Sequence, residues 1–245
     1  MLNRIIHKLL YRMLSLRSYL RVVSGLLFLL QRVGWGRRKP ALEYIYHLDN
    51  LISDDGVALD IGANLGYYTR TLSRVVGASG RVYGVEPVPP IFEVLKHNTR
   101  GCKNVELYNV ALGTDDTTIT MANDSVGADG YFGTGQNFVK EGDAKGGEVV
   151  EFEAQMRRGS ELFGDLERLD LVKCDIEGYE VVVMGEIRPI LERHRPVVLI
   201  ETGGENRKTI IEMFTEMGYR GYTLEQGGEV ALTTESQKDI IFRPE

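Results

Sequence analysis

Short apolar runs alternate along this 245-residue chain with segments whose apolar side chains recur every three or four positions. A short apolar run bounded by glycine or proline is typical of a buried strand, and the longer spacing is typical of a helix. This alternation predicts an α/β fold with a mostly parallel sheet and helices on both faces. The seven expected strands are 57–61, 81–86, 105–111, 169–175, 196–201, 219–224 and 238–242, and the expected helices are 41–51, 67–76, 90–98, 160–166, 179–185 and 206–217.

Residues 113–147 interrupt the alternation because they are rich in glycine, aspartate and threonine. Segments 117–122 and 148–154 on either side have the composition of two paired strands. A long connection of this kind inside a compact domain is commonly functional, so we predict that 113–147 is a lid or insert. Its centre is expected to be a mobile loop that carries Tyr131, Phe132 and Phe138.

The first 40 residues differ from the rest in charge. They contain nine Lys or Arg and no Asp or Glu, whereas the other 205 residues carry a net charge of −15. Apolar positions from Leu2 onward have helical spacing, and Arg4 and Lys8 belong to a separate basic stripe, which predicts a basic amphipathic helix. Glycines and a proline follow, so we expect an N-terminal helical arm over 1–40 and a main domain over 41–245.

Several interpretations of this arm stay open. It packs on its own domain or on a second subunit, or residues 1–33 lie in an anionic membrane surface with their Lys and Arg among the lipid head groups. Two further interpretations of its apolar part, 22–30, are a membrane-spanning helix and a cleaved signal peptide. The acidic body and the lack of interleaved aromatic residues argue against a nucleic-acid partner.

Cysteine and histidine usage narrows the class of protein. Cys102 and Cys174 are too few for a disulfide framework, which predicts a reducing, cytoplasmic compartment, peripheral on the inner face of the membrane if the arm binds lipid. The four histidines have no metal-ligand spacing. The sequence also contains neither the Gly-x-Ser-x-Gly turn of α/β-hydrolases nor the phosphate-binding loop of P-loop enzymes.

A glycine-containing turn follows the first expected strand and reads Asp60-Ile-Gly-Ala-Asn-Leu-Gly66. Ligands of open parallel sheets bind at such carboxyl ends, where Gly62 lets the backbone approach them closely. The dinucleotide fingerprint needs two further glycines, but Asn64 and Tyr67 stand at those positions. Because Asp60 suits a cation and would repel a diphosphate, the turn favours S-adenosylmethionine, whose sulfonium is positive.

Acidic residues end the other expected strands. Glu86 stands where a carboxylate accepts hydrogen bonds from a ribose diol. Asp175, Glu177 and Glu201 end the fourth and fifth strands, where they supply a general base for a hydroxyl or ligands for Mg²⁺ or Ca²⁺. The structural alternative is that Asp175 and Glu177 cap the following helix.

Five segments in register carry a family resemblance: LDIGANLGYYT (59–69), VEPVPPIFEVLKHN (85–98), NVALG (109–113), LVKCDIEGYEVVVMG (171–185) and PVVLIE (196–201). With them the chain resembles the FkbM-type methyltransferases, over roughly residues 55–245. The resemblance implies a Rossmann-like class I methyltransferase fold and methyl transfer from S-adenosylmethionine to a hydroxyl, often on a saccharide. It places the methionine part at the glycine turn, the ribose at Glu86 and the adenine edge at Ala111.

We therefore expect an O-methyltransferase that acts on a saccharide or related small metabolite, with a divalent metal and the oligomeric state left open. A non-catalytic methyltransferase-like module that scaffolds membrane-associated glycan assembly is the alternative. The expected catalytic residues are Asp175, Glu177 and Glu201, and the expected cofactor-binding residues are Asp60, Gly62, Ala63, Asn64, Gly66, Tyr67, Glu86, Pro87, Ala111 and Asp175.

Overall fold

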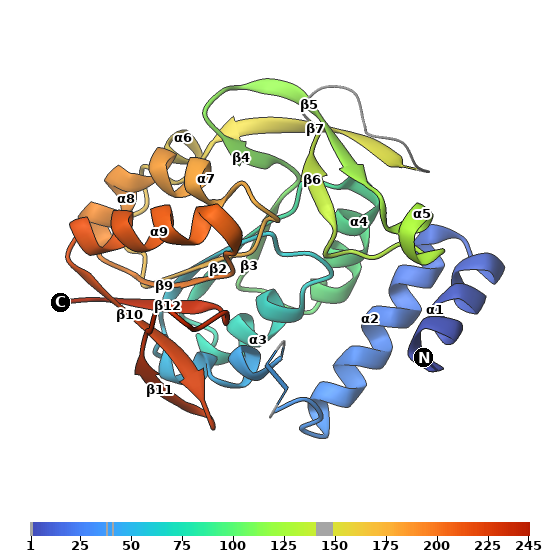
Figure 1. Cartoon of the computed structure of the whole chain (residues 1–245), viewed down its shortest axis with the longest axis horizontal. Helices are drawn as coiled ribbons and strands as arrows, with labels where there is room; N and C mark the ends of the chain where they lie inside the picture. The colour runs from blue at the N-terminus through green and yellow to red at the C-terminus, as the bar shows by residue number, and fades with distance from the viewer. Residues whose placement is uncertain (1, 38, 41, 141–148) are drawn as a thin grey trace.

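The computed structural model describes residues 2–37, 39–40, 42–140 and 149–245, and in this part of the chain an eight-stranded sheet forms the centre of the molecule (Figure 1). The strand order is β11-β10-β12-β9-β8-β1-β2-β3. The strands from β9 to β3 run parallel, whereas β12, β10 and β11 are each antiparallel to their neighbours. The strands are β1 (Val57–Ile61), β2 (Arg81–Val85), β3 (Val105–Tyr108), β8 (Leu171–Cys174), β9 (Val197–Ile200), β10 (Tyr219–Glu225), β11 (Gly228–Ala231) and β12 (Ile240–Pro244).

The direction in which the chain adds strands reverses between β1 and β8. From β1 the chain builds outward through β2 to β3, and it later returns to the other side of β1 with β8 and β9. In open α/β sheets, ligands bind at the carboxyl edge where the strand order reverses in this way. The predicted glycine turn and the predicted acidic strand ends both lie at this edge.

Helices cover both faces because neighbouring side chains of each buried strand point in opposite directions. In β1, Ala58 packs in the core on one face and Leu59 packs in the core on the other. The first face is covered by η1 (Glu43–Tyr46), η2 (Leu48–Asn50), α3 (Tyr67–Val75) and α4 (Pro89–Thr99), and the second by α6 (Gly159–Phe163), α7 (Glu180–Glu186), α8 (Arg188–His194) and α9 (Gly204–Glu216).

A second sheet stands above the carboxyl edge (Figure 1), with the order β4-β7-β5-β6. The predicted pairing of the strands that flank the insert is confirmed, because β5 and β7 are antiparallel partners along their length. The expectation of a mobile loop around Phe132 is wrong, because Phe132 is buried against β7 and the N-terminal helices. Residues 141–148 lie outside the described part. The elements here are β4 (Ala111–Gly113), β5 (Thr117–Asn123), α5 (Ser125–Asp129), β6 (Asn137–Val139) and β7 (Val150–Arg158).

The N-terminal arm contains two helices, α1 (Leu2–Met13) and α2 (Leu16–Arg32), where we expected one amphipathic helix. The break falls at Ser15, whose hydroxyl accepts from the Ser18 amide as an N-cap. Tyr19 and Leu20 of α2 are buried in a core shared with α4, as the interpretation of an arm packed on its own domain requires. No helix among the described residues has the length and apolar content to cross a membrane.

The other expected elements are present, but the structure adds α5, β6 and α8, which we did not predict, and it differs in the following ways. The 41–51 segment forms the short 3₁₀ turns η1 and η2 instead of one helix. The 105–111 strand divides between two sheets, with β3 in the first and β4 in the second. An eighth strand, β11, joins the seven predicted ones because the chain turns at Gly227 and pairs back onto β10.

The shared core beneath α2 predicts that the arm contributes to global stability. Leu20→Ala removes a fully buried side chain and is expected to lower the free energy of unfolding by about 2–5 kcal/mol in urea titration. Leu26→Ala is the matched control, because Leu26 lies on the same helix and is 54% exposed. Equal losses in the two variants would contradict the packing of α2 on the domain.

Candidate active site

The glycine turn after β1 is held over β2 and against the turn that follows β8. The amides of Gly62 and Ala63 both donate to the Val85 carbonyl, at 3.0 and 2.9 Å. Gly62 has φ +76°, and a Cβ added there would collide with the Asp175 carbonyl oxygen. Only glycine satisfies both constraints. The close contact brings the ends of β1 and β8 together at the edge where the strand order reverses.

Asp60 lies beneath this turn and is fully buried. Its Oδ2 accepts from the Thr69 hydroxyl at 2.6 Å, and its Oδ1 is 3.5 Å from the Lys173 ammonium. Burial raises the pKa of Asp60, and the charge of Lys173 opposes that rise. The cation that balances Asp60 is therefore Lys173, which corrects our argument that this carboxylate itself awaits a cationic ligand.

Lys173, which we did not predict as a site residue, joins three parts of the edge. Its ammonium is also 3.5 Å from Asp175 Oδ2 and donates to the Gly62 carbonyl at 3.0 Å. Burial lowers the pKa of Lys173, but the carboxylates of Asp175 and Asp60 outweigh it, and the net shift is upward. The sequence could have indicated Lys173 as a site residue. It lies two residues before Asp175 along an extended segment, and residues with this spacing share one face of a strand.

Glu86 follows β2 and faces the same turn. Its Oε2 accepts from the Asn64 amide at 3.0 Å, and its Oε1 accepts from the Val88 amide at 2.9 Å. The carboxyl group is buried, and burial raises its pKa to about 7. Each oxygen receives one backbone donor and keeps a second lone pair, so the group can accept from two neighbouring hydroxyls.

A small cavity of about 50 Å³ opens above this arrangement. Ligand sites for drug-sized molecules measure roughly 300–1,000 Å³, so S-adenosylmethionine fits only if part of the lining moves. The covering segment is 134–137, and its Thr134 carbonyl accepts from the Asn64 side chain at 3.1 Å. The lining consists of Gly62, Asn64, Glu86, Pro87, Met121, Thr134, Gly135, Asn137, Asp175, Ile176 and Glu177.

The residues just before the covering segment contact the N-terminal arm. His7 stacks on Tyr131 with ring centres 4.9 Å apart, and the Tyr19 hydroxyl donates to the Phe132 carbonyl at 3.2 Å. Arg4 forms an ion pair with Asp129 at the end of α5. The arm therefore packs against residues 129–132, which lead into the covering segment.

The structure brings together half of the predicted cofactor-binding residues. Asp60 lies below the cavity. Tyr67 is turned toward Phe28, with ring centres 5.4 Å apart, and Ala111 pairs with Met156 inside the second sheet. Their direct contact with a cofactor stays a prediction, as it does for the buried Ala63 and Gly66. The predicted residues that line the cavity are Gly62, Asn64, Glu86, Pro87 and Asp175.

The predicted catalytic carboxylates meet beside the cavity. Glu201 and Glu177 are both exposed residues, but their carboxyl groups lie among other protein atoms. Partial desolvation of its carboxyl group and repulsion by Asp175 and two other acids raise the pKa of Glu201 to about 8. Partial desolvation and repulsion by Asp175 likewise raise the pKa of Glu177 to about 7. Such values suit a group that exchanges a proton near neutral pH.

Asp239 is a further member of this cluster that we did not predict. It precedes β12, and Ile240 pairs with Ile200 of β9, so the antiparallel direction of β12 brings Asp239 beside Glu201. Burial and repulsion by Asp175 raise its pKa to about 6. The described residues contain no group of three or more His, Cys, Asp or Glu arranged to hold a metal ion.

Comparisons with known proteins agree with this geometry. A family model described as "Methyltransferase FkbM domain" matches residues 60–223. Protein-L-isoaspartate O-methyltransferase of Methanococcus maripaludis is 32% identical over 97 residues, which are 38% of this chain and 43% of that protein. A probable enzyme of the same name from Dictyostelium discoideum is 47% identical over 45 residues, 18% of this chain and 14% of that protein. The chain thus spans less than half the length of these curated relatives.

Among solved structures, the FkbM methyltransferase of Methylobacillus flagellatus superposes with a TM-score of 0.51 at 15% identity, covering 78% of this chain and 44% of that one. The fold is that of the Rossmann-like class I methyltransferases, which use S-adenosylmethionine. The chain belongs to the FkbM methyltransferase family.

Because the turns after β1 and β8 are in close contact at Gly62, we predict that substitution of Gly62 impairs both cofactor binding and stability. Gly62→Ala is expected to abolish S-adenosylmethionine binding in calorimetry and to lower stability by more than Gly77→Ala, which should cost about 1 kcal/mol. Gly77 is the matched control because it also has positive φ, +63°, but nothing lies within 4 Å of an added Cβ. Normal cofactor affinity in Gly62→Ala would refute the role of this turn.

Proposed function

We propose that this protein transfers the methyl group of S-adenosylmethionine to a hydroxyl oxygen of a small polar acceptor, a saccharide or related metabolite. The observation that carries the proposal is the grouping of Asp175, Glu177, Glu201 and Asp239 beside a cavity floored by Gly62 and Glu86. Glu86, which can accept hydrogen bonds from a ribose diol, the turn at Gly62 and the candidate bases therefore all belong to one edge of the sheet.

The residues of the cavity suit the parts of S-adenosylmethionine. The free lone pairs of Glu86 accept from the two ribose hydroxyls, and the turn at Gly62 and Asn64 leaves room for the methionine part. When bound, the cofactor supplies an electrophilic methyl group on a positively charged sulfur. Asp175 lines this region, and the Lys173 ammonium 3.5 Å from its Oδ2 helps to hold the carboxylate in position.

The acid cluster supplies the proton acceptor. A hydroxyl becomes a better nucleophile when a neighbouring carboxylate takes its proton, and the transfer is most efficient if the pKa of the base lies near the working pH. Glu201, with its pKa raised to about 8, fits this requirement best, and Glu177 is the second candidate. Exclusion of water by the 134–137 segment would hold the acceptor oxygen in line with the methyl group.

The charge of the site favours a hydroxyl over a carboxylate acceptor. The curated relatives are named for methylation of L-isoaspartate, an acidic group. Here desolvation and repulsion by Asp175 raise the pKa values of Glu177, Glu201 and Asp239, so we expect an added negative charge to be repelled. A neutral polyol meets no such penalty, and its hydroxyls can donate to the same oxygens.

The raised pKa values predict that cofactor affinity depends on pH. The sulfonium of S-adenosylmethionine favours ionised carboxylates, so its binding should lower their pKa values and its affinity should rise between pH 6 and 9. The expected rise is about tenfold for each unit by which cofactor binding lowers the pKa of a carboxyl group. S-adenosylhomocysteine is the matched control, because it has the same shape and a neutral sulfur. Calorimetry in buffers of different ionisation enthalpy measures the released protons, and identical pH profiles for the two ligands would contradict the proposal.

The assignment of the base is tested by Glu201→Gln. We expect kcat to fall by about 10²–10⁴-fold with little change in S-adenosylmethionine affinity, measured by transfer of labelled methyl groups to a panel of saccharides. Glu205→Gln is the control, because Glu205 is an exposed acid on the following helix.

Transfer to an isoaspartyl peptide in place of saccharides would overturn the hydroxyl assignment. Cofactor binding with no transfer to either acceptor class would favour a non-catalytic module.

A further inference from the structure

The outer side of the N-terminal arm presents an apolar surface to solvent. Leu26 and Leu29 of α2 and Val33, which caps its C-terminus, are 54%, 59% and 75% exposed, and they recur with helical spacing. Nine of the ten large apolar side chains that are exposed in the described part of the chain belong to residues 5–35. Monomeric soluble proteins seldom gather so much exposed apolar surface in one place, and such patches mark interaction sites.

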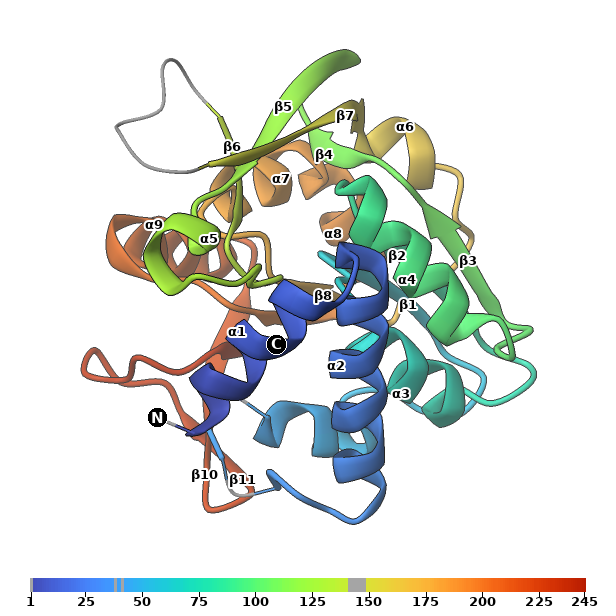
Figure 2. The ribbon, with the colours of Figure 1, turned by 90° about the vertical axis from the view of Figure 1, so that its right-hand side faces the viewer.

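The two helices of the arm lie side by side (Figure 2), and both have exposed apolar side chains. Figure 2 shows α1 and α2 side by side across the side of the molecule nearest the viewer. They are joined by His7, which lies 2.8 Å from the Tyr19 hydroxyl, and by the edge contact between the rings of Tyr11 and Tyr19. We call this surface, with the exposed apolar side chains Ile5, Ile6, Leu9, Met13, Val22, Leu26, Leu29 and Val33, the arm face.

Basic side chains border the arm face. Two of the arm's cations are used by the body, because Arg4 pairs with Asp129 and Arg17 pairs with Glu93. The others on α1 and α2 (Lys8, Arg12, Arg21 and Arg32) form no ion pair within the described residues, and all four are exposed. Apolar residues flanked by unpaired cations are the pattern of helices that lie in an anionic lipid interface.

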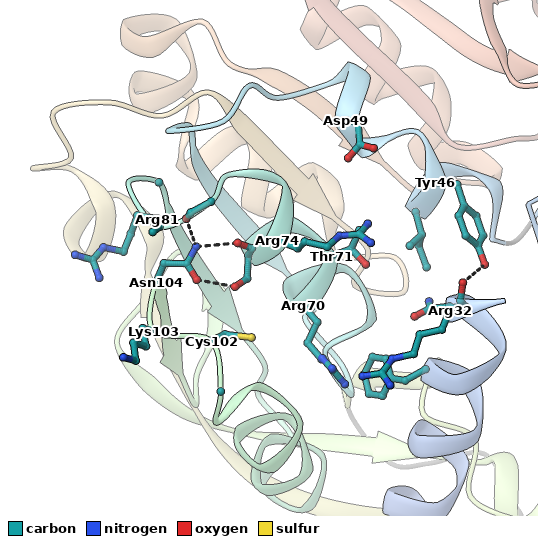
Figure 3. A pocket seen from close by; sticks show the side chains of 18 of the residues that line it. Arg32, Tyr46, Asp49, Arg70, Thr71, Arg74, Arg81, Cys102, Lys103 and Asn104 are labelled. Carbon is teal, nitrogen blue, oxygen red and sulfur yellow. Dashed lines mark hydrogen bonds between the residues drawn. The ribbon is translucent and has the colours of Figure 1, made fainter. Parts of the chain in front are cut away.

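A large basic cavity continues the arm face at the end of α2. It measures about 1010 Å³ and lies between α2, α3 and the loops that precede β2 and β3, at the edge of the sheet opposite the active site (Figure 3). Its basic lining residues are Arg32, Arg37, Arg70, Arg74, Arg81 and Lys103.

The charge of this cavity is not balanced by the protein. Asp49 is its one acidic lining residue, and none of the six cations forms an ion pair in the described part of the chain. Figure 3 shows Arg32 and Arg70 extending toward each other from α2 and α3. The guanidinium of Arg70 lies 4.3 Å from the ring centre of Phe28, which holds it in the opening. Converging guanidinium groups of this kind bind phosphate oxygens.

Arg32, at the wall of the cavity, is followed directly by the exposed Val33 of the arm face. A ligand with a phosphate group beside an apolar chain would satisfy both surfaces at once. We propose that the arm face seats this protein on an anionic phospholipid bilayer, with the basic cavity receiving lipid phosphate groups. The inner side of α2 is already packed on α4, so the docked helix needs no rearrangement of the domain.

Vesicle flotation with the full chain tests the proposal. The protein should bind vesicles that contain phosphatidylglycerol, bind phosphatidylcholine vesicles far less, and dissociate as salt is raised. Leu29→Glu with Val33→Glu is expected to abolish binding, whereas Val230→Glu, which alters an exposed apolar residue on β11, should leave it unchanged. Unaltered S-adenosylmethionine affinity in each variant verifies folding.

The cavity is tested separately. Arg70→Gln with Arg74→Gln should weaken binding to the anionic vesicles by about tenfold, and Lys208→Gln with Arg220→Gln, which removes the same charge from exposed sites on α9 and β10, should have little effect. Equal losses in the two pairs would overturn the role of the cavity.

Binding of inorganic phosphate without vesicle binding would reassign the cavity to a soluble anion. A dimer that the Leu29→Glu, Val33→Glu variant disrupts, again without vesicle binding, would reassign the arm face to a second copy.

Discussion

The active edge depends on one buried cation. The Lys173 ammonium lies 3.5 Å from both Asp60 and Asp175 and donates to the Gly62 carbonyl, so it links the ends of β1 and β8. Removal of a buried ion leaves its partners uncompensated, which is far costlier than loss of a surface pair. Without Lys173, the carboxylates of Asp60 and Asp175 would repel each other without compensation beside the turn at Gly62. The position of Gly62, and through it the shape of the cavity, follows from this charge balance.

The sequence predicted the strands of the parallel sheet well because their side chains are buried on both faces and read as uninterrupted apolar runs. It also predicted which residues reach the carboxyl edge. The sequence did not predict which side chains these residues contact at the carboxyl edge. Asp60 was assigned to the ligand because the balancing charge of Lys173 comes from a strand more than a hundred residues away. Asp239 was missed because its place beside Glu201 depends on the antiparallel direction of β12.

The arm illustrates a second limit of sequence patterns. Its helical periodicity was clear, but a periodic stripe does not reveal which protein surface, if any, will cover it. The structure divides the arm between two roles: Tyr19 and Leu20 complete a core with α4, whereas Leu26, Leu29 and Val33 remain uncovered. The inner side also contacts Tyr131 and Phe132, beside the segment that covers the active-site cavity. The arm is therefore packed next to the part of the chain that leads into the cavity lining.

The raised pKa values of the acid cluster have a thermodynamic consequence. A carboxyl group whose pKa is higher in the folded than in the unfolded state favours folding most at low pH, and this contribution is lost as pH rises through the folded-state pKa. For Glu177 and Glu201 that loss falls between the ordinary value of about 4.5 and values near 7 and 8. Without a bound cation, the cluster is thus least favourable for folding at the pH where these carboxyl groups are ionised. A bound cation would relieve the same repulsion, so on the proposed function the candidate bases would also favour a positively charged cofactor over its neutral product.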